Sequence, residues 1–358
     1  MPKAIIQENN QLKVLRSPEY NFHFDKKSGF FARWGATKED NPEFSEFGPE
    51  IADIEISTIC HGVPSVGVCK FCYKSNTPRG INMTLETFKM IYSKLPKTVT
   101  QIAFGIGDID SNPDMWPIFD YCREVGIVPN VTMNGAGMTP ELAARCASTC
   151  GAVAVSLYDT DVTFDTIKML TDAGMDQINI HFMLSEQTFP RAIKLLQERL
   201  TDPRVQKMNA IVFLGLKPKG RSKGRYTVLK FERFAEAVQK ALVAKIPLGF
   251  DSCSAFKFLK AVKQLIDEGK ISNDPPYEYY EQVSEPCEST CFSAYINTDG
   301  LFYPCSFLEE EPGFEGGLDV VNCQDFLKDI WHHPKTIAYR ERVIQGHKDC
   351  RNCAHYDI

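Results

Sequence analysis

The strongest constraint on the fold is a regular alternation of short apolar runs with amphipathic stretches. Runs typical of buried strands recur at residues 51–58, 100–104, 127–132, 152–157, 177–182, 210–214 and 247–250. Patterns of helical period lie between and after them, at residues 84–95, 115–125, 140–149, 165–173, 190–200, 231–244 and 255–268. Such alternation predicts parallel βαβ units. Six or seven units predict an α/β fold with a full or partial (β/α) barrel, whose active site lies at the carboxyl ends of the strands.

The segments that flank this core are different in character. Apolar and polar residues alternate over 20–24 and 30–34, on either side of the turn-forming residues 25–29, which predicts an N-terminal β-hairpin within residues 1–50. Residues 51–274 then form the predicted barrel. After a linker predicted at residues 275–280, residues 275–358 are rich in cysteine, glycine and loops, and we expect a small metal-stabilised extension.

Composition excludes several classes of protein. The N-terminus has no apolar signal segment and no run approaches the roughly 20 residues that cross a bilayer, so we expect a cytoplasmic protein without a membrane partner. The net charge of -6 gives no general basic footprint for nucleic acid. Thirteen clustered cysteines in a reducing compartment indicate metal or redox chemistry rather than disulfides.

One local basic run interrupts this balance, at residues 217–225. Its simplest interpretation is a solvated loop, since short charge runs are usually exposed. The alternative is a site that grips a carboxylate, a phosphate or an acidic peptide.

Three cysteines follow the first predicted barrel strand, at the end where barrel chemistry occurs. Cys60, Cys69 and Cys72 end in a C-x2-C pair, which brings two sulfurs to one side of a turn. Three thiolates on a [4Fe–4S] cluster leave one iron open for a small molecule. A structural zinc loop is the alternative.

With aromatic Phe71 before the last cysteine, this triad resembles that of the radical S-adenosylmethionine (SAM) enzymes, whose usual motif is C-x3-C-x2-C. Here eight residues, rather than three, separate Cys60 from Cys69. Gly62, Pro64 and Gly67 allow the inserted loop to fold away, and His61 is a possible substitute ligand for Cys60.

Further segments match the family in order at successive strand ends, over residues 51–254. Gly105, Gly107 and Asp108 resemble the segment that contacts the amino group of SAM. The resemblance implies that SAM is also contacted by residues at the ends of the later strands, which are Asn134, Ser156, Asn179 and His181. The last two are expected to point toward the barrel mouth.

The C-terminal cysteines are a second, independent signal. Asp299-Gly300 predicts a hairpin turn that carries Cys305 back toward the preceding cysteines. The pattern resembles the SPASM and twitch extensions of radical SAM enzymes and implies one auxiliary cluster of the [4Fe–4S] type; a zinc ribbon is the alternative. The predicted ligands are Cys305, Cys350, Cys353 and either Cys287 or Cys291.

The remaining cysteines fall into two groups. Buried packing is the expectation for Cys122, Cys146, Cys150 and Cys323. Cys253 follows the last barrel strand and is a candidate catalytic residue, either as a thiol facing the substrate or as an extra cluster ligand.

The resemblance implies that reductive cleavage of SAM yields a 5′-deoxyadenosyl radical, which abstracts hydrogen from a residue of a ribosomally made peptide. It also implies a peptide partner, a separate leader-binding protein and an electron donor such as flavodoxin or ferredoxin. The alternatives are a radical SAM dehydrogenase of a small alcohol or sugar, and a non-catalytic zinc-stabilised barrel.

Overall fold

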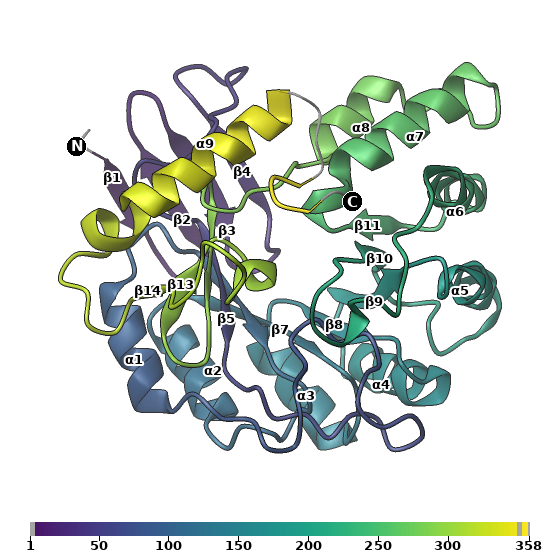
Figure 1. The fold of residues 1–358 in the computed structure, drawn as a ribbon, viewed down its shortest axis with the longest axis horizontal. Helices are drawn as coiled ribbons and strands as arrows, with labels where there is room; N and C mark the ends of the chain where they lie inside the picture. Colours follow the sequence, from purple (N-terminus) through teal and green to yellow (C-terminus); the bar gives the residue numbers. More distant parts are fainter. Residues whose placement is uncertain (1–3, 349–352, 357–358) are drawn as a thin grey trace.

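The computed structural model describes residues 4–348 and 353–356 of the chain. Within these residues the strands form a 4-stranded sheet of order β1-β2-β3-β4 and a 10-stranded sheet of order β11-β10-β9-β8-β7-β6-β5-β12-β13-β14 (Figure 1). Strands β5 to β11 are mutually parallel, and helices α1–α6 lie outside their curved sheet (Figure 1). The predicted α/β class and its barrel-type strand order are confirmed.

The elements of the parallel sheet agree closely with the sequence pattern. Its strands are β5 (Ile51–Glu55), β6 (Gln101–Gly105), β7 (Val128–Met133), β8 (Val153–Ser156), β9 (Ile178–Leu184), β10 (Ala210–Gly215) and β11 (Leu248–Phe250). Its helices are α1 (Leu85–Lys94), α2 (Met115–Glu124), α3 (Pro140–Thr149), α4 (Thr160–Asp172), α5 (Phe189–Thr201), α6 (Phe231–Val243) and α7 (Ala255–Asp267). Thr84 caps α1 by accepting a hydrogen bond from the Thr87 amide at 3.1 Å.

The two faces of the parallel sheet have opposite character. Residues that face the helices, such as Ile54, Phe104 and Ile180, are fully or almost fully buried in one apolar core. The alternate residues are polar or small, and the parallel register places Asp53 opposite Ala103 and Ser156 opposite His181. The inner face therefore carries polar and small side chains, in contrast to the apolar face that packs on the helices.

The N-terminal segment is larger than the predicted hairpin. The hairpin exists as β3 (Asn21–Asp25) and β4 (Phe31–Trp34), but β1 (Ile5–Glu8) and β2 (Leu12–Arg16) extend it to a four-stranded antiparallel sheet. Phe22 and Phe24 are fully buried against this sheet's neighbours. The first two strands are short and mixed in polarity, which is why the sequence pattern did not reveal them.

The C-terminal segment continues the barrel sheet. Strands β12 (Ser293–Ile296) and β13 (Leu301–Tyr303) form the predicted hairpin, with Gly300 at a φ of +80°. Strand β12 pairs in parallel with β5, Ile296 opposite Ile54, and β14 (Leu318–Asp319) pairs with β13. The linker prediction for residues 275–280 is wrong, because the short helix α8 (Tyr277–Val283) begins there and Tyr280 packs against Phe258.

Helix α9 (Pro334–Lys348), near the C-terminus, packs against the N-terminal sheet. Its Tyr339 and Val343 share a buried apolar cluster with Phe22 and Phe24 of the N-terminal sheet. In Figure 1 this yellow helix crosses over the purple N-terminal strands.

A buried polar contact links three parts of the chain. Arg33 of β4 pairs with Glu50, which precedes β5, at 2.7 Å, and with Glu288 of the C-terminal segment at 3.2 Å. Its guanidinium also stacks on Phe292, 3.4 Å from the ring centre.

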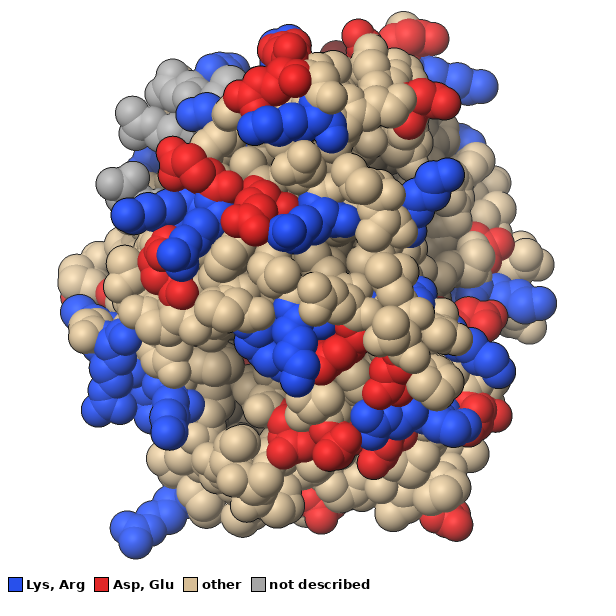
Figure 2. Space-filling view, turned by 90° about the vertical axis from the view of Figure 1, so that its right-hand side faces the viewer, with Lys and Arg blue, Asp and Glu red and all other residues tan. Residues whose placement is uncertain are grey.

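The surface carries mixed charge. On the face shown in Figure 2, Lys and Arg are interspersed with Asp and Glu and form no continuous basic area. Of the helices in the described part of the chain, none has the length and apolar character needed to span a membrane.

Candidate functional site

Cys60 lies where the ends of three strands converge. Its Sγ is 3.9 Å from Oδ1 of Asp108, which follows β6, and 4.0 Å from Nδ2 of Asn134, which follows β7. Its backbone amide donates to the carbonyl of Thr77 at 3.0 Å, which ties the loop after β5 back on itself. Three segments singled out in the sequence therefore meet at one point.

Asp108 organises this junction. Its carboxylate accepts hydrogen bonds from Asn134 Nδ2 at 2.6 Å and from the His61 amide at 2.7 Å, and it contacts His61 Nδ1 at 2.8 Å. Asp108 is only 4% exposed, whereas most of the His61 ring is accessible. The carboxylate thus orients the start of the cysteine loop.

Gly107 is required for this close approach. A Cβ atom at this position would lie 2.7 Å from Cys60 Cβ and 3.0 Å from its Sγ. At Gly105 a Cβ would meet nothing closer than 3.6 Å, from Glu55. The structure therefore requires a glycine at position 107 but has room for a side-chain carbon at position 105.

The residues inserted after Cys60 close into a turn. The Gly67 amide donates to the Val63 carbonyl at 2.7 Å. Gly62 has a φ of +77°, and a Cβ there would lie 2.1 Å from the Gly67 carbonyl oxygen. The insertion therefore folds on itself, as its glycines predicted.

The basic run holds the second half of the cysteine loop. Arg221 Nε donates to the Cys69 carbonyl at 2.8 Å, and the Arg221 amide donates to the Cys72 carbonyl at 2.9 Å. A Cβ at Gly220 would lie 2.2 Å from the Tyr73 carbonyl oxygen, so the two backbones are in direct contact. The interpretation of this run as a simple solvated loop is wrong, because Arg221 is a structural part of the site.

Aromatic rings surround the C-x2-C pair. The Phe71 ring lies 5.7 Å from that of Tyr158 and 5.5 Å from that of Tyr226. Tyr158 hydrogen-bonds to Ser156 and to Cys69, and burial raises the pKa of the Cys69 thiol to about 12. Phe71 and Ser156 are thus neighbours of the cysteine loop, and Tyr158, which sequence reasoning missed, connects them.

The thiols of the cysteine loop are not gathered around a single point. In the described ranges, no three His, Cys, Asp or Glu side chains form a group that could hold one metal ion. In a [4Fe–4S] cluster each thiolate binds a different iron, whereas the ligands of a zinc ion all bind one metal. Backbone amides also point at the sulfurs, from Gly62 toward Cys60 and from Phe71 toward Cys69. Such N–H···S hydrogen bonds stabilise ligating thiolates.

The two predicted residues of β9 have different places. His181 is level with Ser156 on the inner face, and burial lowers its pKa to about 4, so the imidazole is neutral at pH 7. Asn179 lies nearer the amino end of β9 and accepts a hydrogen bond from Asn209 at 3.1 Å. The expectation that Asn179 points toward the mouth is wrong, since it is engaged at the opposite end of the sheet.

Asp53 is a further inner-face group that sequence reasoning missed. Its carboxyl is accessible from the inner face, but the surrounding protein desolvates it, and this desolvation raises its pKa to about 6. A charged residue at the third position of an otherwise largely apolar strand could have marked Asp53 as a candidate in the sequence.

A second group of thiols forms where the barrel meets the C-terminal segment. Cys253, in the turn after β11, interacts with the thiols of Cys287 and Cys353. Cys305 is half-buried and interacts electrostatically with Cys253 and Cys353, and desolvation by the surrounding protein raises its pKa to about 12. Cys350 lies outside the described residues.

Cys291 is more deeply buried than Cys287. It is fully buried in the apolar cluster beneath α9, against which Cys287 and Cys305 also pack, and its charged neighbours include Arg340 and Glu288. Of the two alternatives for a ligand, Cys287 is the one that interacts with Cys253.

Two lysines with buried side chains form ion pairs near the two groups of thiols. Lys217 pairs with Asp251, which also accepts from the Gly215 amide at 3.0 Å. Lys74, two residues after Cys72, pairs with Glu55 at 2.9 Å and with Glu309, and donates to Tyr295 at 2.8 Å. Sequence patterns do not reveal these pairs, because their partners are far apart in the chain.

The remaining cysteines pack as predicted. Cys122 and Cys146 are fully buried, Cys150 is nearly so, and Cys323 donates its thiol proton to the Val320 carbonyl at 3.2 Å. A thiol that donates in this way is not prepared to bind a metal.

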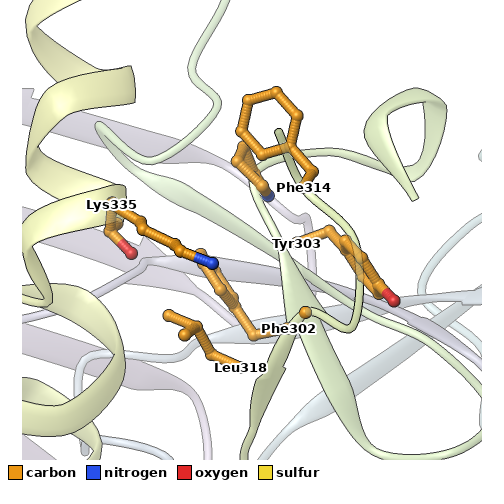
Figure 3. Close-up of a pocket in the computed structure, with 8 residues that line it drawn as sticks. Phe302, Tyr303, Phe314, Leu318 and Lys335 are labelled. Atoms are coloured by element: carbon orange, nitrogen blue, oxygen red, sulfur yellow. The ribbon is translucent and has the colours of Figure 1, made fainter. Parts of the chain in front are cut away.

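Two cavities lie away from the cysteine loop in the described part of the chain. The pocket in Figure 3, between the β13 region, Phe314 and the start of α9 at Lys335, has a volume of about 20 Å³, which is room for one water molecule. A groove of about 400 Å³ between Phe44 and α9 contains no cysteine.

Comparison with known proteins agrees with this geometry. Residues 287–354 match the SPASM family, described as an iron-sulfur cluster-binding domain. No curated protein sequence matches the chain significantly.

Two solved structures share the fold. The structure of Streptococcus suis SuiB bound to precursor peptide SuiA has a TM-score of 0.67 and 12% identity, covering 94% of this chain and 90% of that one. The structure of native anSMEcpe with bound AdoMet and Cp18Cys peptide has a TM-score of 0.57 and 12% identity, covering 83% and 84%. The resemblance predicted from the sequence is confirmed at the level of the fold, which is shared with SuiB and anSMEcpe, and of the SPASM match over residues 287–354.

Proposed function

We propose that this chain, which has the radical SAM fold and a C-terminal SPASM domain, is an enzyme that modifies a ribosomally made peptide by hydrogen abstraction. The observation that carries the proposal is the convergence of Cys60 with Asp108 and Asn134, at the carboxyl ends of three successive parallel strands.

Each part of the cysteine loop has a distinct task in this proposal. Cys60, Cys69 and Cys72 hold a [4Fe–4S] cluster, and Asp108 fixes the start of their loop through the His61 amide. With SAM bound at its open iron, that cluster supplies a 5′-deoxyadenosyl radical. Gly105, Gly107, Asn134 and Ser156 border the space assigned to SAM.

The surroundings protect this chemistry. Phe71, Tyr158 and Tyr226 form an aromatic cluster beside the C-x2-C pair and cover part of it from solvent. His181, neutral at pH 7, and Asp53 present polar groups to a substrate on the inner face.

A peptide is the substrate that the comparisons favour. SuiB and anSMEcpe, which share the fold over most of the chain, were each solved with a bound peptide. A separate leader-binding protein, a flavodoxin or ferredoxin as electron donor, and a cytoplasmic site of action remain parts of the proposal.

The first test needs only SAM and a reductant. After anaerobic reconstitution with iron and sulfide, the protein should cleave SAM to 5′-deoxyadenosine when dithionite is added. Cys72→Ala should abolish cleavage, whereas Cys122→Ala, which removes a packing thiol, should retain it. Normal cleavage in Cys72→Ala, or zinc without iron in the protein, would refute the proposal.

The second test addresses the substrate. Synthetic peptides from short reading frames beside the gene, deuterated at carbon, should transfer deuterium to 5′-deoxyadenosine and change in mass. Transfer from deuterated small alcohols or sugars, and from none of the peptides, would favour a dehydrogenase instead.

A further inference from the structure

We infer that Tyr73 and Lys74, which follow Cys72, are positioning residues through which an acidic segment of the C-terminal part (residues 305–311) fixes the C-x2-C loop. The inference rests on the proposed function in one respect, namely that this loop holds the first cluster. It gives the acidic segment a second task, because the segment then shapes the site at the barrel mouth as well as carrying a cysteine of its own.

Tyr73 connects the neighbours of two cysteines. It follows Cys72, whereas Ser306 and Phe307 follow Cys305. The Tyr73 hydroxyl donates to Ser306 Oγ at 3.2 Å, and the ring centres of Tyr73 and Phe307 are 4.3 Å apart. One side chain thus makes a polar and an aromatic contact between two segments that lie far apart in the sequence, within two residues of a predicted cluster ligand on each side.

Lys74 makes a second contact, which is ionic. Its Nζ lies 2.9 Å from Oε2 of Glu55 on β5, donates to the Tyr295 hydroxyl at 2.8 Å and pairs with Glu309 of the acidic segment. The side chains of Lys74, Glu55 and Glu309 are 9%, 7% and 18% exposed. Because a buried carboxylate is costly without a cation, both carboxylates hold Lys74, and with it the end of the cysteine loop, in one place.

The C-terminal hairpin fixes the two carboxylates that receive Lys74. Glu309 accepts a hydrogen bond from Asn297 Nδ2 at 2.8 Å, and Glu55 accepts one from the Thr298 hydroxyl at 3.3 Å. Asn297 and Thr298 lie in the turn after β12, the strand that pairs with β5. The acceptors are therefore held by the sheet, and Lys74 is the group that brings the cysteine loop to them.

The basic run holds the same two segments from the other side. Arg221 donates to two carbonyls of the cysteine loop, whereas Lys219 pairs with Glu311 of the acidic segment at 3.1 Å. The Lys217 ammonium lies 4.8 Å from the centre of the Phe307 ring. Basic run, cysteine loop and acidic segment thus form one junction, so a change in the acidic segment should reach the C-x2-C pair.

Changes made in the acidic segment and measured in the cysteine loop test the inference. In the metal-free full-length protein, Glu309→Gln should speed amide hydrogen exchange across residues 69–76 by about tenfold, as expected for the loss of one charged hydrogen bond. Glu310→Gln is the matched control, because that carboxylate accepts from the Gly316 amide at 3.1 Å and from Tyr303. Equal exchange in the two variants would overturn the inference.

A spectroscopic readout separates positioning from simple stability. After anaerobic reconstitution, the EPR spectrum of the reduced protein is recorded with and without SAM. Lys74→Met should alter the signal and weaken the effect of SAM on it, and Lys74→Arg, which keeps the cation, should restore both. Lys270→Met, which breaks an exposed pair with Glu268, should keep the wild-type spectrum. A less stable Lys74→Met protein with a wild-type spectrum would overturn the positioning role.

A pair of smaller changes covers the case in which the charge variants fail to fold. Ser306→Ala and Tyr73→Phe each remove one hydroxyl and no charge. If the two hydroxyls act through their hydrogen bond, each variant should speed exchange across residues 69–76, and the double variant should exchange no faster than either one. Additive effects, or no effect, would overturn the inference.

The outcomes separate this inference from the proposed function. Wild-type protein without iron or SAM cleavage would refute the proposed function, whereas the exchange experiment needs neither iron nor SAM. Normal SAM cleavage in wild type, together with wild-type exchange in Glu309→Gln and a wild-type spectrum in Lys74→Met, would overturn the inference alone.

Discussion

At the scale of single residues, the site depends on the absence of a side chain at Gly107. We expect Gly107→Ala to lower the free energy of unfolding of the metal-free protein by about 1–3 kcal/mol, as overpacking does, because the new Cβ would lie 2.7 Å from that of Cys60. Gly105→Ala is the matched control, since its Cβ would meet nothing closer than 3.6 Å. Urea denaturation compares the two, and equal loss of stability would contradict the prediction.

Residues near one another in the chain were predictable, and residues brought together by the fold were not. Cys60, Gly107, Asp108 and Asn134 follow strand ends that the sequence pattern located, so their convergence was expected from parallel topology. The partners of Cys253 lie 34 or more positions away and depend on how the C-terminal segment docks. No local pattern encodes that choice.

At the scale of elements, the run 217–225 is a brace for the cysteine loop. We expect Arg221→Met to speed amide hydrogen exchange across residues 69–76 and to lower iron retention after gel filtration, because two loop carbonyls lose their guanidinium donor. Each such charged hydrogen bond contributes about 1.5–3 kcal/mol. Arg225→Met, an exposed position on the same run, is the control. Similar exchange in both variants would show that Arg221 does not brace the loop.

The helices and strands of the barrel were largely predictable because each one has a clear apolar period. Helix α3 has the predicted bounds, and α1 begins one residue after the start of its predicted range, with Thr84 as its cap. Helix α8 was missed because two prolines precede it and its apolar face is only one short turn long. The parallel pairing of β12 with β5 was missed because it joins positions about 240 residues apart, which only tertiary packing selects.

At the scale of the whole molecule, Arg33 ties the N-terminal sheet to the barrel and the C-terminal segment. We expect Arg33→Met to lower the free energy of unfolding by about 3–5 kcal/mol, since it leaves Glu50 buried without its cationic partner. Lys168→Met, which breaks an exposed pair with Asp172, should cost less than about 1 kcal/mol. Equal effects in urea denaturation would mean that the Arg33 contacts do not couple the three parts.

The parallel pairing of β12 with β5 also sets an order of events during synthesis. Strand β5 leaves the ribosome early, yet the partner on one of its edges is residues 293–296, which emerge near the end of translation. Until then the hydrogen-bonding groups on that edge have no β12 to pair with. The loop that begins just beyond β5 is the one that carries Cys60, Cys69 and Cys72. The nascent chain thus keeps the loop proposed to bind the first cluster beside an unpaired strand edge for most of its synthesis, until β12 is made and pairs with β5.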